Sequence, residues 1–153
     1  MDYSTTVRSP IGILTLTADD DALTGLHMGT KATEGRKDPT RFTDVISQLE
    51  RYWERELKDF DIELRPTGTL FQLRVWEALR GIPYGKTVSY GEIARRIESP
   101  RAVRAVGRAN GSNPIAIIVP CHRVIGTNGT LTGYGGGLPR KQKLLRLEGA
   151  WPA

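Results

Sequence analysis

Residues 113–124, NPIAIIVPCHRV, contain the only cysteine of the chain. The apolar run 115–119 lies between two prolines, and a run of about five such residues predicts a short buried strand. Pro120 has no N–H to donate to a neighbouring strand, so regular pairing should end there. We therefore expect Cys121 to lie at a turn at the end of a rigid element, with His122 beside it.

The pair formed by Cys121 and His122 is a candidate for covalent chemistry. A thiol next to an imidazole can be a nucleophile paired with a base. A lone cysteine is more often buried and inert, and it then behaves as a small apolar residue. Here the following residues are His122 and Arg123 rather than apolar groups, which favours the reactive interpretation.

The length, the composition and the small number of cysteines and histidines argue against several classes of protein. A length of 153 residues allows one compact domain or two small ones, and 39% hydrophobic with 25% charged residues is typical of a soluble globular protein. No apolar run approaches the roughly 20 residues of a membrane span, and residues 1–6 lack a signal-peptide pattern. One cysteine permits no internal disulfide, and with only two histidines a Cys/His zinc site is disfavoured. We therefore expect a cytoplasmic protein with no metal, cofactor or membrane contact.

Charge is divided unevenly along the chain. Residues 1–65 hold 9 basic and 13 acidic side chains, whereas residues 66–153 hold 13 basic and 4 acidic ones. A strongly basic half suggests that this part of the molecule meets a polyanion, and nucleic acid is the favoured candidate. A solvated basic surface without a partner is the alternative.

The first part of the chain reads as a small sheet with one helix. Alternating polar and apolar residues over 3–28, interrupted by turn signals at 9–12 and 19–21, predict an antiparallel meander. Apolar residues then recur at steps of three and four over 42–57, as expected for an amphipathic helix packed on that sheet. Residues 60–64 alternate again and predict one more short strand. The segment 66–68 is a plausible boundary, because the charge balance changes sign there.

The second part opens with helices. Thr69 with Gln72, and Ser89 with Glu92, each have the spacing of a capping box, which predicts helix starts at both places. Residues 99–100, Ser-Pro, predict the cap and first position of a third helix that runs from Arg101 to about residue 110. Two short helices joined by such a tight turn are typical of a helix-turn-helix.

An arginine stripe is expected on the third helix. Counted from Arg101, the next two arginines follow three residues later, at Arg104, and seven residues later, at Arg108. At about 100° per residue, these three positions share one face of a helix. Basic residues on the second helix of a helix-turn-helix are expected to meet DNA phosphates and grooves. An exposed helix face without a partner is the alternative.

Two further features lie near the end of the chain. Residues 133–137, GYGGG, are too rich in glycine for core packing, so they allow close backbone approach to a ligand or form a plain loop. A last helix is predicted from Pro139, and Glu148 lies at its end, where the helix dipole disfavours a carboxylate. We expect a protonated imidazole or an arginine to offset that cost.

Taken with these features, the PCHRV stretch after Asn113-Pro114 resembles the active-site signature of the O6-alkylguanine-DNA alkyltransferases. The likeness covers nearly all of residues 69–150, in matching order, and residues 1–65 resemble the family's variable N-terminal domain only in length and pattern. It implies an α/β (α+β) fold. The N-terminal domain, 1–65, would be a ribonuclease H-like antiparallel sheet with a helix, and the C-terminal domain, 69–153, a winged-helix-like helix-turn-helix domain carrying the cysteine.

The resemblance also implies an activity, which is direct repair of O6-alkylguanine and, more weakly, of O4-alkylthymine, with one turnover per protein. Cys121 would accept the alkyl group, His122 would be its base through a water, Glu148 would orient His122, and Asn113 would brace the turn. The partner would be double-stranded DNA containing O6-alkylguanine, bound by a monomer, with cooperativity left open. The implied DNA-binding residues are Ser89, Tyr90, Arg101, Arg104 and Arg108. The implied substrate-binding residues are Tyr90, Val124, Tyr134 and Gly135.

Three other functions are compatible with parts of this sequence. A relative that binds alkylated bases without transfer would lack an acceptor cysteine, which Cys121 argues against. A helix-turn-helix regulator would use Cys121 only structurally and would bind undamaged sites. A papain-type hydrolase would need local signatures around its cysteine that are absent here.

Overall fold

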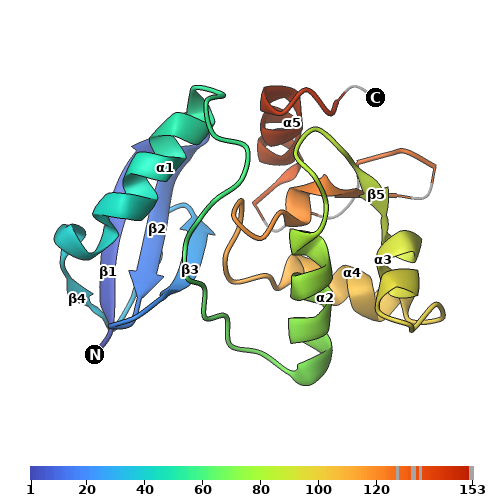
Figure 1. Cartoon of the computed structure of the whole chain (residues 1–153), viewed down its shortest axis with the longest axis horizontal. Helices are drawn as coiled ribbons and strands as arrows, with labels where there is room; N and C mark the ends of the chain where they lie inside the picture. Colours follow the sequence, from blue (N-terminus) through green and yellow to red (C-terminus); the bar gives the residue numbers. More distant parts are fainter. Residues whose placement is uncertain (127, 132–133, 135, 152–153) are drawn as a thin grey trace. The chain divides into compact units, whose positions relative to one another are not determined.

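The computed structural model describes residues 1–126, 128–131, 134 and 136–151 (Figure 1). The chain forms two compact units, Met1–Thr67 (unit 1) and Gly68–Ala153 (unit 2). Among the described residues, no helix is long and apolar enough to cross a membrane.

Unit 1 is built on a four-stranded sheet in the order β3-β2-β1-β4. Strands β1 (Tyr3–Ser9), β2 (Gly12–Ala18) and β3 (Leu23–Met28) pair antiparallel, as the alternation of residues predicts. The short β4 (Arg36–Lys37) joins β1 in parallel, so the sheet is mixed rather than purely antiparallel. Sequence alternation could not reveal β4, because two polar residues carry no periodic signal.

One helix lies over a face of this sheet (Figure 1). A 3₁₀ turn, η1 (Pro39–Phe42), leads into α1 (Thr43–Trp53), which buries Val45, Leu49 and Tyr52. The predicted strand at 60–64 is reduced to a single bridge between Leu64 and Leu23. The other residues of this segment do not pair as a strand because Gln48 takes the place of a neighbouring strand. Its side-chain amide exchanges hydrogen bonds with the backbone of Asp61 and so satisfies groups that a strand would have paired.

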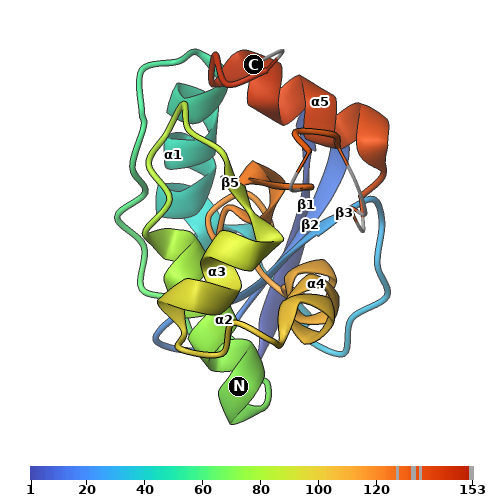
Figure 2. The same ribbon diagram turned by 90° about the vertical axis from the view of Figure 1, so that its right-hand side faces the viewer.

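Unit 2 is mainly helical. Its helices are α2 (Leu70–Arg80), α3 (Tyr90–Arg96), α4 (Val103–Gly111) and α5 (Leu138–Leu147), and Figure 2 shows α3 and α4 beside each other. A two-stranded parallel sheet pairs β5 (Val88–Ser89) with β6 (Val124–Ile125). The predicted capping box of Thr69 and Gln72 is present in full. Ser89 caps α3, whereas the Glu92 carboxylate pairs with Arg95 instead of returning to the cap.

The start of the third helix was predicted wrongly. Helix α4 begins at Val103, and Ala102, its preceding residue, provides no side-chain cap. Ser99 instead opens a turn in which its carbonyl accepts the Ala102 N–H at 2.9 Å. Arg101 therefore lies in the turn between the helices, while Arg104 and Arg108 remain one helical turn apart on α4. A Ser-Pro pair suits either a helix start or a tight turn, so local sequence could not distinguish them.

The strand predicted at 115–119 is also absent. The segment is buried, but it folds as consecutive tight turns, and Ile117 has a φ of 72°. Hydrogen bonds run from Ile118 N–H to Ala116 and from Val119 N–H to Ile115. A run of apolar residues predicts that a segment is buried. Burial alone does not require an extended backbone, so the strand prediction failed here.

Candidate active site

Cys121 is the first residue of η2, a 3₁₀ helix spanning Cys121–Arg123, and it leads directly into β6. Its exposure is 5%, and it is a free thiol. The preceding turns carry the cysteine in place of the expected strand. The thiol therefore sits inside unit 2, at the end of a short and mostly buried segment.

Asn113 braces this segment. Its Nδ2 donates to the carbonyl oxygens of Val119 at 2.8 Å and Ile115 at 3.4 Å, and its Oδ1 accepts the Ile115 N–H at 3.0 Å. These contacts join both ends of the apolar run, which a strand would have held apart. One amide side chain thus replaces a sheet ladder in satisfying the buried backbone.

The imidazole next to the thiol belongs to a buried charged group of three side chains. His122 Nε2 and Glu148 Oε2 are 2.8 Å apart, and both side chains are fully buried. Arg123 donates to Glu148 through Nε at 2.8 Å and through Nη2 at 3.0 Å, and its Nη1 donates to the Ile82 carbonyl. Arg123 is therefore the arginine partner that the sequence predicted for Glu148 at the end of α5, and His122 adds a further contact.

The electrostatics of this group fix the form of the imidazole. Burial disfavours the charge of Glu148, but His122 and Arg123 outweigh it and lower the pKa of the carboxyl to about 2. The pKa of His122 is lowered, chiefly by burial and also by Arg123, although Glu148 opposes the shift. His122 is consequently neutral at pH 7, with its Nε2–H donating to the carboxylate. Its Nδ1 is then an acceptor, and it is buried without a hydrogen-bond partner among the described residues.

The thiol must lose its proton to react. Burial raises the pKa of Cys121, while Asn113, Lys141 and Tyr134 act in the opposite direction. Burial likewise raises the pKa of Tyr134, together with its interaction with Cys121. The Tyr134 hydroxyl is buried and has no hydrogen-bond partner within the described chain. Gly135 lies outside the described residues.

Two residues at the site were missed by the sequence reasoning. Asn110, at the end of α4, is buried and donates from Nδ2 to the Cys121 carbonyl at 3.3 Å. Lys141, in the first half of α5, is fully buried and donates from Nζ to the Val124 carbonyl at 2.6 Å. A lysine among polar neighbours carries no burial signal. It could have been suspected only from its place one helical turn before the buried Leu144 and Leu145.

The predicted DNA-contact residues lie on or next to the helix-turn-helix. Arg104 and Arg108 are exposed on α4, and Arg101 is exposed in the turn before it. Tyr90 opens α3, and its ring lies beside Gly107 of α4 and 6.0 Å from Lys141 Nζ. The Ser89 hydroxyl accepts the Glu92 N–H as the cap of α3. Tyr90 thus stands between the arginine-bearing helix and the buried site.

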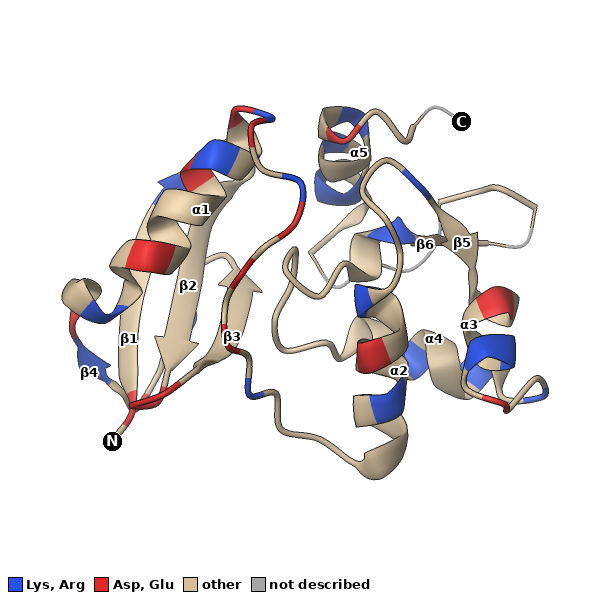
Figure 3. Cartoon of the chain, viewed as in Figure 1, with Lys and Arg blue, Asp and Glu red and all other residues tan. Residues whose placement is uncertain are grey.

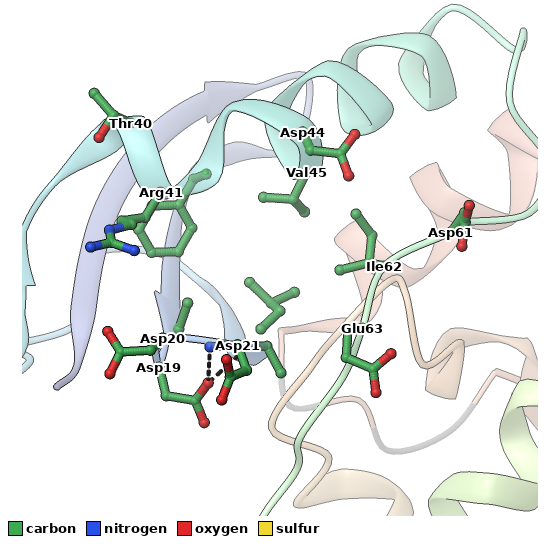
Figure 4. Close-up of a pocket in the computed structure, with 14 residues that line it drawn as sticks. Asp19, Asp20, Asp21, Thr40, Arg41, Asp44, Val45, Asp61, Ile62 and Glu63 are labelled. Atoms are coloured by element: carbon green, nitrogen blue, oxygen red, sulfur yellow. Dashed lines mark hydrogen bonds between the residues drawn. The ribbon is translucent and has the colours of Figure 1, made fainter.

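The two units differ in net charge, which is negative in the first part of the chain and positive in the second. Figure 3 shows basic segments on α3, α4 and α5, and acidic segments in the loops of unit 1. A pocket of about 440 Å³ in unit 1 is lined by six carboxylates (Figure 4). Asp19 there accepts the N–H groups of Asp21 and Ala22, both at 2.8 Å. Among the described residues, no three His, Cys, Asp or Glu side chains are placed to hold a metal ion.

A buried free thiol that precedes a neutral imidazole, in the same unit as an arginine-bearing helix-turn-helix, is the arrangement expected of a DNA-binding protein with a reactive cysteine. Two family models match: the 6-O-methylguanine DNA methyltransferase ribonuclease-like domain over residues 3–66, and the DNA binding domain over residues 70–150. The chain belongs to the 6-O-methylguanine DNA methyltransferase family. It is a DNA-repair methyltransferase with the two-part fold expected from the sequence.

Individual relatives agree with this assignment. The chain is 57% identical to a methylated-DNA–protein-cysteine methyltransferase of Mycolicibacterium paratuberculosis, over 94% of this chain and 90% of the relative. It is 51% identical to one of Methanosarcina acetivorans, over 97% and 99%. The crystal structure of Mycobacterium tuberculosis OGT in complex with DNA superposes with a TM-score of 0.92 at 56% identity, covering 96% of this chain and 92% of that one.

Proposed function

We propose that Cys121 accepts the alkyl group of O6-alkylguanine, and more weakly that of O4-alkylthymine, from double-stranded DNA, once per chain. The observation that supports this most directly is the buried thiol followed by His122, whose Nδ1 is an acceptor without a partner in the described chain. A buried acceptor of this kind is costly unless a donor reaches it. In the proposed reaction the thiol proton, relayed by a water, is that donor.

The proton transfer and the attack are coupled in this mechanism. His122 Nδ1 accepts the thiol proton, and the imidazolium that forms is stabilised by Glu148 through the 2.8 Å contact at Nε2. The sulfur then attacks the alkyl carbon, so that the sulfur–carbon bond forms as the carbon–O6 bond breaks. The electron pair of the broken bond goes to the guanine, which takes up one proton and leaves as guanine. A thioether has no easy route to hydrolysis, so the chain is used up.

The leaving guanine needs donors as its negative charge develops. Tyr134 is proposed to close over the base, and its buried hydroxyl lacks a full partner among the described residues. The Gly135 amide is proposed as the donor to O6. The Cys121 and Val124 carbonyls are proposed acceptors for the guanine amino group. The Val124 carbonyl already accepts from Lys141, and the Cys121 carbonyl accepts from both Asn110 and the Val124 N–H, so the base would share these oxygens with protein donors.

Access to the base requires that it leave the duplex. A buried thiol cannot reach a paired base, and base flipping needs a side chain to fill the space that the base vacates. We propose Arg104 for that role, Tyr90 for contact with the flipped nucleotide, and Arg101, Arg108 and Ser89 for backbone contacts. Domain 69–153 would then carry DNA binding and transfer, and 1–65 would be a separate N-terminal domain. The proposed acting species is a monomer in the cytoplasm, where a single thiol stays reduced.

Arg104→Ala should slow repair in duplex DNA much more than reaction with free O6-benzylguanine. Both substrates need the thiol, but only the duplex needs a side chain in place of the flipped base. Arg108→Ala is the matched control, one turn along on α4 and also exposed. It should weaken DNA affinity and reduce the salt slope by about 1, as loss of one phosphate contact does. Equal slowing of Arg104→Ala on both substrates would exclude the proposed filling role.

The proposal as a whole is tested by incubating excess protein with a duplex that carries one isotope-labelled O6-methylguanine. We expect one label per chain by intact mass, located on Cys121 by peptide mapping, and a duplex restored to guanine. Added chelator should not change the result, because Cys121 and His122 react without a metal in this mechanism. Several labels transferred per chain, or a label on another residue, would contradict single use of Cys121.

A further inference from the structure

Lys141 is an unusual residue for its position. Its side chain is fully buried, whereas the other lysines, at positions 31, 37, 58, 86 and 143, are all exposed. Lysine is almost never fully buried without a compensating interaction, because an ammonium group is expensive to remove from water. The proposed proton transfer and attack do not use this residue. Its place in the site therefore calls for a physical reason.

The surroundings of Lys141 Nζ are those of the reactive centre. It donates to the Val124 carbonyl at 2.6 Å, three residues after the thiol, and lies 5.9 Å from the Tyr134 ring centroid and 6.0 Å from that of Tyr90. Burial lowers the pKa of Lys141 to about 8, and Cys121 acts to raise it. The amine is therefore still protonated at pH 7. The influence is mutual, because Lys141 lowers the pKa of the Cys121 thiol.

We propose that Lys141 is the cation that stabilises the thiolate form of Cys121 during alkyl transfer. The inference rests on the proposed role of Cys121 as acceptor. The cluster of Cys121, Lys141, Tyr90 and Tyr134 provides the low-polarity setting in which one positive charge has a large effect. Because it acts through the sulfur rather than by bonding to the substrate, Lys141 is a positioning residue.

The same charge also directs the proton. Glu148 favours a proton on His122, while Arg123 and Lys141 disfavour it. An imidazolium beside Lys141 is thus a transient state, and its proton is driven onward to the departing guanine. Lys141 stabilises the negative charge on sulfur before the bond forms, and it opposes retention of the proton on His122 afterwards. No oxidant, metal or other reactant enters this sequence.

Four substitutions separate a charge role from a structural one. Lys141→Met fills the space without charge, and it should fold because it replaces a buried ammonium by an apolar chain. Lys141→Gln keeps a neutral donor for the Val124 carbonyl, and Lys141→Arg keeps the charge. Lys143→Met is the matched control, because Lys143 is exposed two residues along the same helix. Circular dichroism melts would establish which variants are folded.

The measurement is the rate of Cys121 alkylation by iodoacetamide against pH, which reports the thiol pKa without DNA or a guanine substrate. We expect the thiol pKa in Lys141→Met and Lys141→Gln to lie at least about one higher than in the wild type, the effect of removing a nearby opposite charge. Transfer from free O6-benzylguanine at pH 7 should then slow by about tenfold or more. Lys141→Arg should recover most of the rate, and Lys143→Met should match the wild type.

An unchanged thiol pKa in folded Lys141→Gln would overturn the proposal, even if transfer slowed, because it would leave Lys141 only its hydrogen bond to Val124. A different result would contradict the proposed function itself. If wild-type Cys121 reacts with iodoacetamide but never with O6-benzylguanine or O6-methylguanine DNA, the acceptor role is wrong, whatever the Lys141 variants do. If Met, Gln and Arg variants all fold and titrate alike, the charge has no role.

Discussion

Cys121→Ala is expected to transfer no label from an O6-methylguanine duplex while still binding that duplex. The chain has no second cysteine to take over the reaction, and the other side chains lack a nucleophile as reactive as a thiolate. Cys121→Ser should be inactive too, because an alcohol is far less acidic than a thiol and His122 is neutral rather than strongly basic. The measurements are label transfer by intact mass and DNA affinity by fluorescence anisotropy.

The DNA-affinity measurement is as informative as the label-transfer measurement. The exposed arginines of α4 are untouched by the substitution, so affinity for duplex DNA should remain within about twofold of the wild type. The lesion should also stay bound longer, because the variant cannot convert it to guanine. Residual transfer to Cys121→Ala would place the acceptor elsewhere and remove the basis of the mechanism.

Glu148→Gln is expected to slow alkyl transfer by about 10²–10³, in the range that general-base assistance usually contributes. The amide removes the negative charge that stabilises imidazolium at His122, and its NH₂ group would face donors of His122 or Arg123. Arg123 is then a buried cation without its carboxylate, so the free energy of unfolding should fall by about 3–5 kcal/mol. Glu77→Gln is the control, because Glu77 is exposed and forms a surface ion pair with Arg80.

Acid unfolding gives a second test of Glu148. Its pKa in the folded protein is lowered from 4.5 to about 2, so its ionised form favours the folded state. That contribution is complete above pH 4.5, and it is lost as the pH falls from there towards 2. The unfolding free energy of Glu148→Gln should therefore depend less on pH in this window than that of the wild type. Parallel curves for the two proteins, measured by urea unfolding, would show that Glu148 is not held as described.

The sequence predicted those features that have a local cause. Thr69 and Gln72 form their capping box because both partners lie within one turn, and the spacing of apolar residues predicted α1, although this helix ends at Trp53 rather than near residue 57. Glu148 was recognised because a carboxylate at a helix end needs a compensating partner, and the structure supplies the Arg123 cation together with a hydrogen bond from neutral His122.

The failures have a common physical origin in long-range side-chain contacts. Asn113 folds the apolar run 115–119 into turns by hydrogen bonds that no periodicity records. Asn110 and Lys141 reach the site from α4 and α5, and neither residue type signals burial. Such contacts arise only when distant segments meet, so propensity and pattern cannot reveal them.

Helix α5 carries Lys141, and Glu148 follows its last residue as the C-cap, seven residues after Lys141. Seven residues turn a helix by about 700°, so the two side chains leave it on nearly the same face, with about 10 Å of axial rise between them. The helix therefore fixes the spacing between one positive charge at the Val124 carbonyl and one negative charge at the His122 imidazole. Inserting or deleting one residue between them would rotate one charge by about 100° away from the other. The length of α5 is thus constrained by the chemistry at its two ends, and this segment should tolerate no change of register even where its exposed residues vary freely.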